Sequence, residues 1–468
     1  MAVDSDEAAK GSSLDAVERC LENAERFRHL NAFIRPNLHA RDEASAVDQR
    51  HADGEHLPLR GMVIAVKDNI ETAGLATSGG SVALQSYVPH SDAFALQALK
   101  RQGAVVIGKT NLDELAGGGS TLSSLGGQSR NPYDPARTPA GSSGGSAIAV
   151  ATGACTFALG TETVNSIRNP ANVCGILGLR PTRGLVSRSG VIPVSPTMDV
   201  LGPLASTVDD LARALRFIVG FDPADAVTLA AKDYDVDNLH PCRWPDVKGM
   251  RIGVLSGLFG QGEEHLGVNA VLKSALERLE GQGAEIIELS DPHFDSAALY
   301  ADLALHAYEF HQAFDSWLEG LGDKAPISSF KAYVDDGRWP QATMQQLLAV
   351  ALDAERPESQ VIYARKKAAA QAIQQVLENL IDDHGLQAFA YPAQHRAALN
   401  IGQASRPERN GVLASAIGWP AINVPVGLSD GLPVGLDLMA RPFQEPLLLS
   451  LAKAAHLQPP APVAMTFS

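Results

Sequence analysis

Two segments far apart in the chain carry hydroxyl and amine groups that could act together on a carbonyl carbon. Residues 139–168 read PAGSSGGSAIAVATGACTFALGTETVNSIR and contain Ser142, Ser143 and Ser166. The glycines around the first two serines allow tight turns and the close approach of a substrate. A serine oxygen attacks a carbonyl only when a base removes its proton. The segment therefore predicts nucleophilic catalysis and requires a base from elsewhere.

The candidate base is Lys67, in the segment GMVIAVKDNIETAG. The apolar run from Met62 to Val66 is typical of a buried strand, and it ends in this single lysine. Burial disfavours the ammonium form, so it lowers the pKa of the amine and lets the amine accept a proton from a hydroxyl. Lys67, Ser142 and Ser166 would then form a proton relay.

Each of these residues also has a structural interpretation. The serines at 142, 143 and 146 could belong to a flexible or helix-capping Gly/Ser loop. Lys67 alone would be a solvated lysine at the end of a strand, which is the usual role of lysine. Ser166 could be the N-cap of a short helix in SIRNPANV, a role that is compatible with catalysis.

Several blocks occur in an order that favours catalysis. VKDNIETAG, GKTNLDELAGG, GSSGGSA, TETVNSIRNPANVCGILGLRPT and GLPVGLDLMARPF resemble, in sequence, the blocks of the amidase signature family of serine amidohydrolases. The resemblance runs from about Leu30 to the C-terminal helix, and an ordered set of this kind is far more specific than GSSGG alone.

The resemblance implies a Ser–cis-Ser–Lys triad. Ser166 would be the nucleophile, Ser142 the bridging serine after a cis peptide bond from Gly141, and Lys67 the base. Ser142 would pass the proton of Ser166 to Lys67, the path would reverse to protonate the leaving amine, and water would then hydrolyse the acyl-enzyme. This chemistry implies no metal and no cofactor. Ser143 is a candidate substrate contact.

The resemblance also implies an oxyanion hole made by backbone N–H groups from Thr163 to Ser166. Here the chain departs from the family pattern of Asp, a variable residue, Gly, Gly and Ser, because it has Glu162, Thr163, Val164, Asn165 and Ser166. If those glycines need a left-handed backbone, Val164 is costly and Asn165 more tolerable. We expect the two side chains to narrow the acyl site, with the amide of Asn165 as a substrate contact.

Other polar residues near these motifs receive structural interpretations. Arg168 keeps the family's Ser-Ile-Arg, and we expect it to be a buried partner of Glu162 or of nearby carbonyl groups. His306 and His311 lie in the helical stretch LALHAYEFHQAF without a third ligand at metal-site spacing, so we expect helix-surface or pocket-lining residues and no metal site.

The substrate is less defined than the reaction. The segment SRSGVIPVSPTMDVLGPLAST resembles small-molecule amidases, which favours a small primary or N-substituted amide. The alternatives are a ureide or carbamate hydrolase, or the glutamine-hydrolysing A subunit of a tRNA-dependent amidotransferase. Against the amidotransferase alternative, VIYARKKAAAQA replaces the Tyr-Ala-rich block of such subunits. A non-catalytic binding protein on the same fold is the remaining alternative, favoured only by the altered turn.

Composition limits the partners. The formal charge of −15 argues against nucleic acid binding, which needs clustered Lys and Arg, although it allows a carboxylate-bearing substrate. No segment reaches the apolar length of a membrane span, and the polar N-terminus lacks a signal-peptide pattern, so we expect a cytoplasmic protein. Homodimers are frequent among members of the family, so the resemblance allows a homodimer.

The element pattern and the resemblance together predict one α/β domain over residues 1–468, a mixed central β-sheet with helices on both faces. We expect an opening helix in SLDAVERCLENAERFRHLNAF and then a charged loop through His56. Thr207 should cap a helix in TVDDLARALRFIVG. RIGVLSG and AEIIELS should be strands around a helix, and residues 295–385 a helical insert that walls the substrate pocket.

Overall fold

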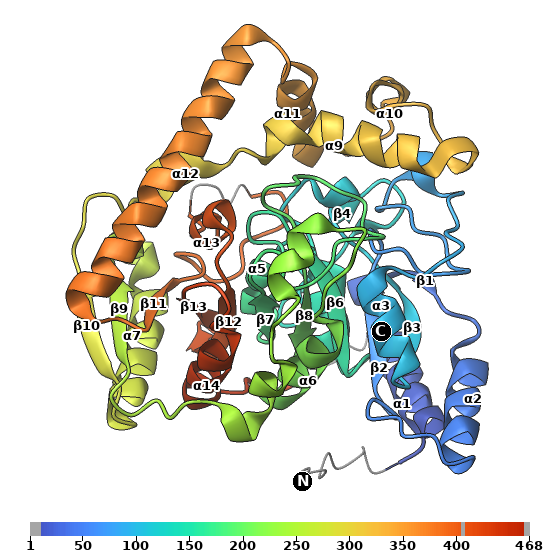
Figure 1. Ribbon diagram of the computed structural model, residues 1–468, viewed down its shortest axis with the longest axis horizontal. Helices are drawn as coiled ribbons and strands as arrows, with labels where there is room; N and C mark the ends of the chain where they lie inside the picture. The colour runs from blue at the N-terminus through green and yellow to red at the C-terminus, as the bar shows by residue number, and fades with distance from the viewer. Residues whose placement is uncertain (1–10, 404–407, 463–468) are drawn as a thin grey trace.

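The computed structural model describes residues 11–403 and 408–462. Their strands form one large mixed sheet in the order β1-β3-β2-β6-β8-β7-β12-β13-β11-β9-β10 (Figure 1). The predicted α/β architecture is confirmed. The strands of this sheet are β1 Phe33–Pro36, β2 Val63–Lys67, β3 Val105–Thr110, β6 Phe157–Glu162, β7 Leu177–Arg180, β8 Val200–Ala205, β9 Arg251–Leu255, β10 Glu285–Leu289, β11 Ala388–Pro392, β12 Ala421–Ser429 and β13 Leu432–Met439.

The sheet is parallel in two places, antiparallel between them, and antiparallel again at one edge, where β1 pairs with β3. β2 pairs in parallel with both β3 and β6, and β9 pairs in parallel with β10 and β11. The central strands β8, β7, β12 and β13 pair with antiparallel neighbours. A short separate pair is made by β4 Leu122–Ser123 and β5 Gly127–Gln128.

Helices cover both faces of the sheet because successive strand side chains point to opposite faces. On β2, Val63 and Ala65 pack with one group of helices, whereas Ile64 and Val66 pack with another. The first group is α1 Ser13–Arg26, α2 Ala40–Ala52, α4 Gly144–Ala151 and α5 Arg168–Val173. The second group is α3 Phe94–Arg101, α6 Val208–Ile218, α7 Leu266–Gly281 and α14 Glu445–Ala455.

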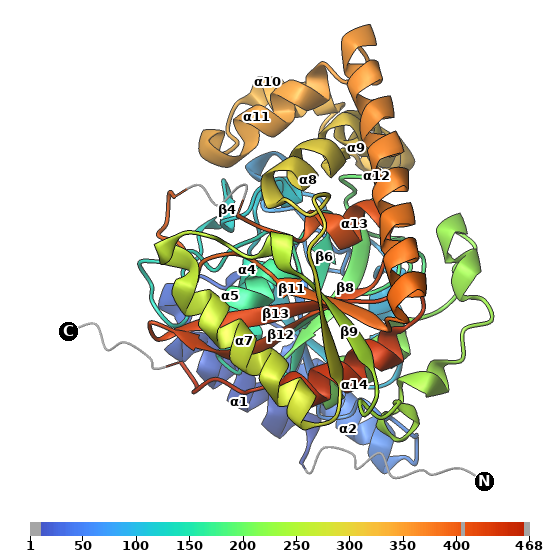
Figure 2. The same ribbon diagram turned by 90° about the vertical axis from the view of Figure 1, so that its left-hand side faces the viewer.

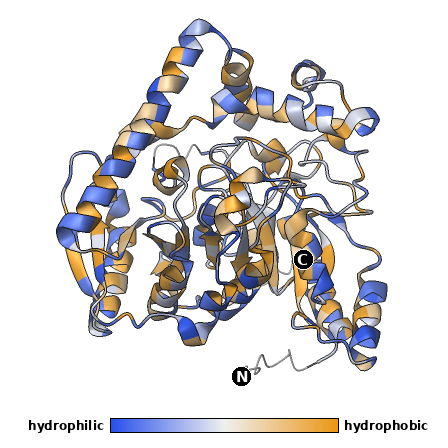
Figure 3. Cartoon of the chain, in the orientation of Figure 1, coloured by the Kyte–Doolittle hydropathy of each residue, from blue (hydrophilic) through white to orange (hydrophobic). Residues whose placement is uncertain are grey.

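Most of the remaining helices lie at one end of the sheet, above α13 Val412–Ile417 in Figures 1 and 2, whereas α12 Pro357–His384 runs from this end down past α13. In Figure 3 they carry hydrophobic and hydrophilic residues in alternation, and their apolar sides form two further cores. The prediction of a mostly helical segment over 295–385 is therefore confirmed. These insert helices are α8 Ser296–Leu303, α9 His306–Leu321, α10 Phe330–Asp336, α11 Gln341–Leu352 and α12 Pro357–His384.

Local predictions succeed in most elements and fail in one. Thr207 caps α6, because its side chain accepts a hydrogen bond from the N–H of Asp210 at 3.1 Å. The expected charged loop before His56 is wrong, since this stretch forms β1 and α2. The sequence of α2 is rich in helix formers, and Ala40, Ala44 and Val47 bury one face at helical spacing.

Candidate active site

Lys67 is the last residue of β2 and is fully buried. By the alternation of the strand, its side chain leaves the sheet on the same face as Val63 and Ala65, which is the face that α4 covers. Lys67 Nζ is hydrogen-bonded to Ser142 Oγ at 2.7 Å. It also donates to Thr161 Oγ1 at 2.8 Å and to the Thr161 carbonyl at 3.2 Å.

Burial has the largest effect on the pKa of the Lys67 amine. It lowers the pKa of Lys67 from 10.5 to about 7, although the negative fields of Asp113, Asp199 and Glu162 act in the opposite direction. An amine with a pKa near neutrality is a proton acceptor at ordinary working pH.

Ser142 follows a cis peptide bond from Gly141, at the start of the turn that leads into α4. A side chain at Gly141 has no room, because a Cβ there would lie 1.9 Å from Asp113 Oδ2. The backbone of Asp113 in turn donates to the Ser142 carbonyl at 3.2 Å. These packing contacts fix the backbone that presents the Ser142 hydroxyl to Lys67.

Ser143, the next residue, is fully buried. Its hydroxyl donates to the Thr161 carbonyl at 3.2 Å, and its N–H donates to the Ser166 carbonyl at 3.1 Å. Ser143 is absent from the described walls of the hollows near Ser166, so in this geometry it joins backbone segments.

Ser166 lies in the turn between β6 and α5, and 5% of its surface is exposed. It borders a cavity of about 30 Å³ together with Thr163, Val164 and Asn165. Its hydroxyl forms no hydrogen bond with another residue of 11–403 or 408–462. The structure thus joins Lys67 to Ser142 directly and leaves the Ser166 oxygen open to the cavity.

The altered turn avoids the strain that its sequence suggests. The non-glycine residues with a left-handed φ include Leu115 and Ala116, which flank the site, but neither Val164 nor Asn165. Asn165 gains room from Gly411, where an added Cβ would lie 2.2 Å from the Asn165 Cβ. Within the described chain, the N–H groups of residues 164–166 have no acceptor.

Glu162 and Arg168 form a buried ion pair at 2.7 Å under the turn. Arg168 also contacts Asp437 at 2.7 Å and donates to the Val164 carbonyl at 3.3 Å. Burial raises the pKa of Glu162, but the charges of Arg168 and Arg180 outweigh it and hold this pKa below its usual range. Burial raises the pKa of Asp437 to about 6. This network fixes the shape of the turn.

Thr163 connects the turn to the helical insert. Its hydroxyl donates to Asp199 Oδ1 at 2.6 Å, and the other oxygen of Asp199 accepts from the N–H of Ser195 at 2.8 Å. Ser195 Oγ donates to Glu309 of α9 at 2.5 Å, and Tyr363 of α12 donates to the same carboxylate at 2.6 Å.

The two histidines of α9 have different places. His306 borders the cavity beside Ser166. His311 lies 3.2 Å from Asp315 and stacks on Phe330 at 4.8 Å between ring centroids. In residues 11–403 and 408–462 there is no group of three His, Cys, Asp or Glu side chains arranged to hold a metal ion.

Sequence reasoning missed the roles of Thr161, Asp113 and Arg409. Thr161 binds Lys67 from β6, and Arg409 borders the Ser166 cavity although it lies far along the chain. The GKTNLDELAGG block was a signal for Asp113, but nothing in the sequence linked Arg409 to the site.

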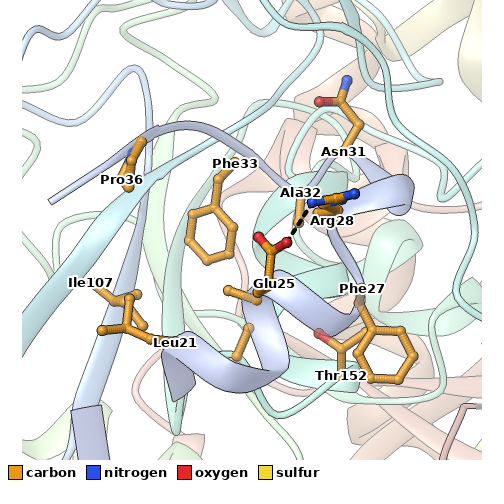
Figure 4. Close-up of a pocket in the computed structure, with 12 residues that line it drawn as sticks. Leu21, Glu25, Phe27, Arg28, Asn31, Ala32, Phe33, Pro36, Ile107 and Thr152 are labelled. Carbon is orange, nitrogen blue, oxygen red and sulfur yellow. Dashed lines mark hydrogen bonds and ion pairs between the residues drawn. The ribbon is translucent and has the colours of Figure 1, made fainter. Parts of the chain in front are cut away.

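A second, separate pocket of about 310 Å³ lies between α1 and β1 (Figure 4). Leu21, Phe33 and Ile107 form apolar walls, and Glu25 and Arg28 form an ion pair at 2.5 Å. It shares no described residue with the cavity at Ser166. Among the described helices, none is long and apolar enough to cross a membrane.

Comparison with known proteins finds a family model and relatives that are similar to this chain. Residues 15–449 match the family model described as Amidase. The chain is 35% identical to the A subunit of glutamyl-tRNA(Gln) amidotransferase from Methanosarcina acetivorans, over 96% of this chain and 94% of that protein. It is 38% identical to the protein of the same name from Synechococcus sp., over 90% and 89%.

Solved structures are similar over nearly the whole length. Native peptide amidase from Stenotrophomonas maltophilia has a TM-score of 0.84 at 32% identity, covering 97% of this chain and 96% of that one. The A subunit of glutamyl-tRNA(Gln) amidotransferase from Thermotoga maritima has a TM-score of 0.73 at 28% identity, covering 97% and 98%.

Proposed function

Because the chain belongs to the amidase family, whose members' shared chemistry is cleavage of C–N bonds, we propose that it is a serine amidohydrolase that works through an acyl-enzyme. Ser166 is the nucleophile, Ser142 the proton relay and Lys67 the base. The observation that carries this assignment is the 2.7 Å hydrogen bond between a buried lysine of lowered pKa and Ser142, beside a serine that faces a cavity.

The reaction begins when Ser166 Oγ attacks the amide carbon. Its proton moves to Ser142, whose own proton moves to neutral Lys67. The free N–H groups of residues 164–166 are the donors for the oxyanion, and each such donor is worth a few kcal/mol, on the order of 3, in the transition state. The protons return along the same path to the leaving amine, and a water molecule then releases the acid by the reverse relay.

We propose a primary amide as the substrate, with ammonia as the leaving group. The amidotransferase relatives and peptide amidase are named for chemistry at amides. Ureides and carbamates are the alternatives.

Two functional settings are candidates: the chain works either as a subunit of a complex with partner proteins or as an enzyme that acts alone. Identity of 35–38% to amidotransferase A subunits favours glutamine as the substrate and a complex as the working form. The higher TM-score with peptide amidase, 0.84 against 0.73, favours an enzyme that acts alone. The chain's VIYARKKAAAQA segment, in place of the Tyr-Ala-rich block of the amidotransferase, agrees with the second setting, which we place first.

The proposal also assigns a role to the helical segment 295–385. Tyr300 and His306 border the cavity at Ser166, and Thr343 and Gln346 of α11 border the hollows next to it. We therefore assign the wall of the substrate site to residues 295–385.

The test is ammonia release by the purified chain from glutamine, amidated peptides and simple monoamides, with a ureide and a carbamate for comparison. Turnover of any amide that disappears in Ser166→Ala supports the assignment. Activity only after addition of partner proteins and charged tRNA would reverse the order of the two settings. No turnover and no Ser166-dependent labelling by a fluorophosphonate at any pH would favour the non-catalytic binding protein.

A further inference from the structure

The hollows around Ser166 have an unusual charge pattern for this chain. The protein carries 53 Asp and Glu against 38 Lys and Arg. The cavity of about 30 Å³ at Ser166 adjoins a hollow of about 920 Å³ under α11, with which it shares Gly118 and Arg409. It also adjoins a hollow of about 430 Å³ beside α8 and α9, with which it shares Gly117, Tyr300 and His306.

No carboxylate side chain is among the described residues that line these three hollows. Their ionisable lining is basic or neutral instead. Arg409 lines the cavity at Ser166 and the large hollow, and Lys366 of α12 lines the hollow beside α8. In a chain of charge −15, a site lined in this way offers a favourable field to an anion.

Arg409 is held firmly at the junction. Only 7% of its surface is exposed, and its Nη2 donates to the Gly119 carbonyl at 2.9 Å. A Cβ at Gly119 would lie 2.3 Å from Arg409 Nη1, so the glycine makes space for the guanidinium to lie against the turn. A guanidinium has five donors, and its planar fork matches the geometry of a carboxylate.

The large hollow extends this polar surface without adding charge. Its walls carry several side-chain amides, which can donate to a carboxylate and accept from water: Gln341, Gln345, Gln346 and Gln403. The amide nitrogen of Gln128 in the same wall already donates to backbone carbonyl groups. An anionic group next to Arg409 would thus meet hydrogen-bond donors on several sides. The buried carboxylate that interacts with Arg409, Asp113, lines none of the three hollows and already accepts hydrogen bonds from the N–H groups of Ser120 and Leu122.

We propose that Arg409 is a specificity-determining residue that binds a carboxylate on the acyl part of the substrate. The preferred substrates are then monoamides of small dicarboxylic acids, which carry one carboxylate and one primary amide. Glutamine has the same two groups, but its ammonium meets no described carboxylate in the walls. A monoamide without an ammonium is the better substrate. This inference rests on the proposed amide hydrolysis.

The experiment compares kcat/KM for succinamate and glutaramate with that for butyramide, which lacks the charge, and for glutamine. The unmodified enzyme should prefer the anionic monoamides over butyramide by about 10- to 100-fold, the usual value of a hydrogen-bonded charge contact. In Arg409→Gln the ratio of kcat/KM for the anionic monoamides to kcat/KM for butyramide should fall towards one. Arg409→Lys should keep part of this preference. The preference should also weaken with added salt.

Arg396→Gln is the matched control. Arg396 lies in the same region, forms an ion pair with Glu408 and lines none of the three hollows, so the same chemical change there should leave the preference intact. Inhibition by succinate compared with butyrate gives a second measurement that needs no turnover. Succinate should inhibit more strongly, and Arg409→Gln should remove the difference.

The outcomes separate this inference from the proposed function. Hydrolysis of neutral and anionic amides at equal rates would overturn the role of Arg409 and leave the amidase assignment standing. An equal loss of kcat/KM for all substrates in Arg409→Gln would also overturn the role of Arg409. A higher kcat/KM for glutamine than for glutaramate would overturn it as well. Absence of any amide turnover, with succinate still bound more tightly than butyrate, would count against the amidase assignment alone.

Discussion

Replacement of Lys67 by methionine should remove the group that controls kcat/KM near neutral pH. Burial lowers the pKa of Lys67 from 10.5 to about 7, which corresponds to about 5 kcal/mol of destabilisation of the ammonium form. At pH 8 about nine-tenths of the amine is therefore neutral, against about 0.3% for a pKa of 10.5. Desolvation thus raises the amount of active base about 300-fold.

The expected pH profile follows from this pKa. In the unmodified enzyme kcat/KM should rise with pH and level off above about 7, because the base must be deprotonated. Lys67→Met should lower kcat/KM about 100- to 10,000-fold, the usual contribution of general base catalysis, and its residual activity should lack the step near pH 7.

Lys109→Met is the control for the loss of a buried amine. Lys109 is also fully buried, and burial lowers its pKa to about 8, but it binds the Ile70 carbonyl and Thr77 and does not contact Ser142. Its replacement should change stability and keep the step near pH 7. A step that persists in Lys67→Met, or one that vanishes in Lys109→Met alone, would refute the assignment of the base.

The same substitution at Lys67 should alter stability in the opposite direction to activity. Its folded pKa lies below the unfolded value, so between about pH 7 and 10.5 the unfolded chain binds a proton that the folded chain does not. The cost of burying this amine is therefore full below about pH 7 and declines as pH rises. Urea unfolding of Lys67→Met should show its largest gain relative to the unmodified protein at low pH.

Three further predictions concern the surroundings of the triad. Glu162→Gln leaves Arg168 in the core with one partner fewer and should lower the free energy of unfolding, measured with urea, by about 3–5 kcal/mol. The control Glu18→Gln, at the surface, should change this free energy little. Asn165→Gly should lose the native substrate if the side chain binds it, or accept bulkier acyl groups if the role is steric; unchanged kcat/KM ratios would exclude both. Glu309→Ala should raise KM more than it lowers kcat, because the insert loses its link to the turn, and a loss confined to kcat would argue against this link.

The sequence was sufficient for the elements whose patterns are local. The apolar run before Lys67 predicted β2, and Thr207 predicted the start of α6. Charged residues hid α2, because only Ala40, Ala44 and Val47 mark its buried face. The ordered blocks identified the family because several short patterns recur together over most of the chain.

The parts of the site that the sequence did not reveal depend on contacts between distant segments. Arg409 reaches the cavity through the packing of the chain before α13 against the turn at Gly119. The residue types of the turn did not predict the backbone angles of Val164. The room that the altered turn needs comes from Gly411, which lies far from it in the sequence. Both features depend on tertiary packing rather than local propensity.

The most direct measurement of the central claim is mass spectrometry of the enzyme quenched during turnover of an amide substrate. The account predicts an acyl group on the peptide that contains Ser166, absent in Ser166→Ala and formed more slowly in Lys67→Met. An acyl group on Ser142 or on another residue, or rapid turnover by Ser166→Ala, would contradict the assignment of Ser166 as the nucleophile.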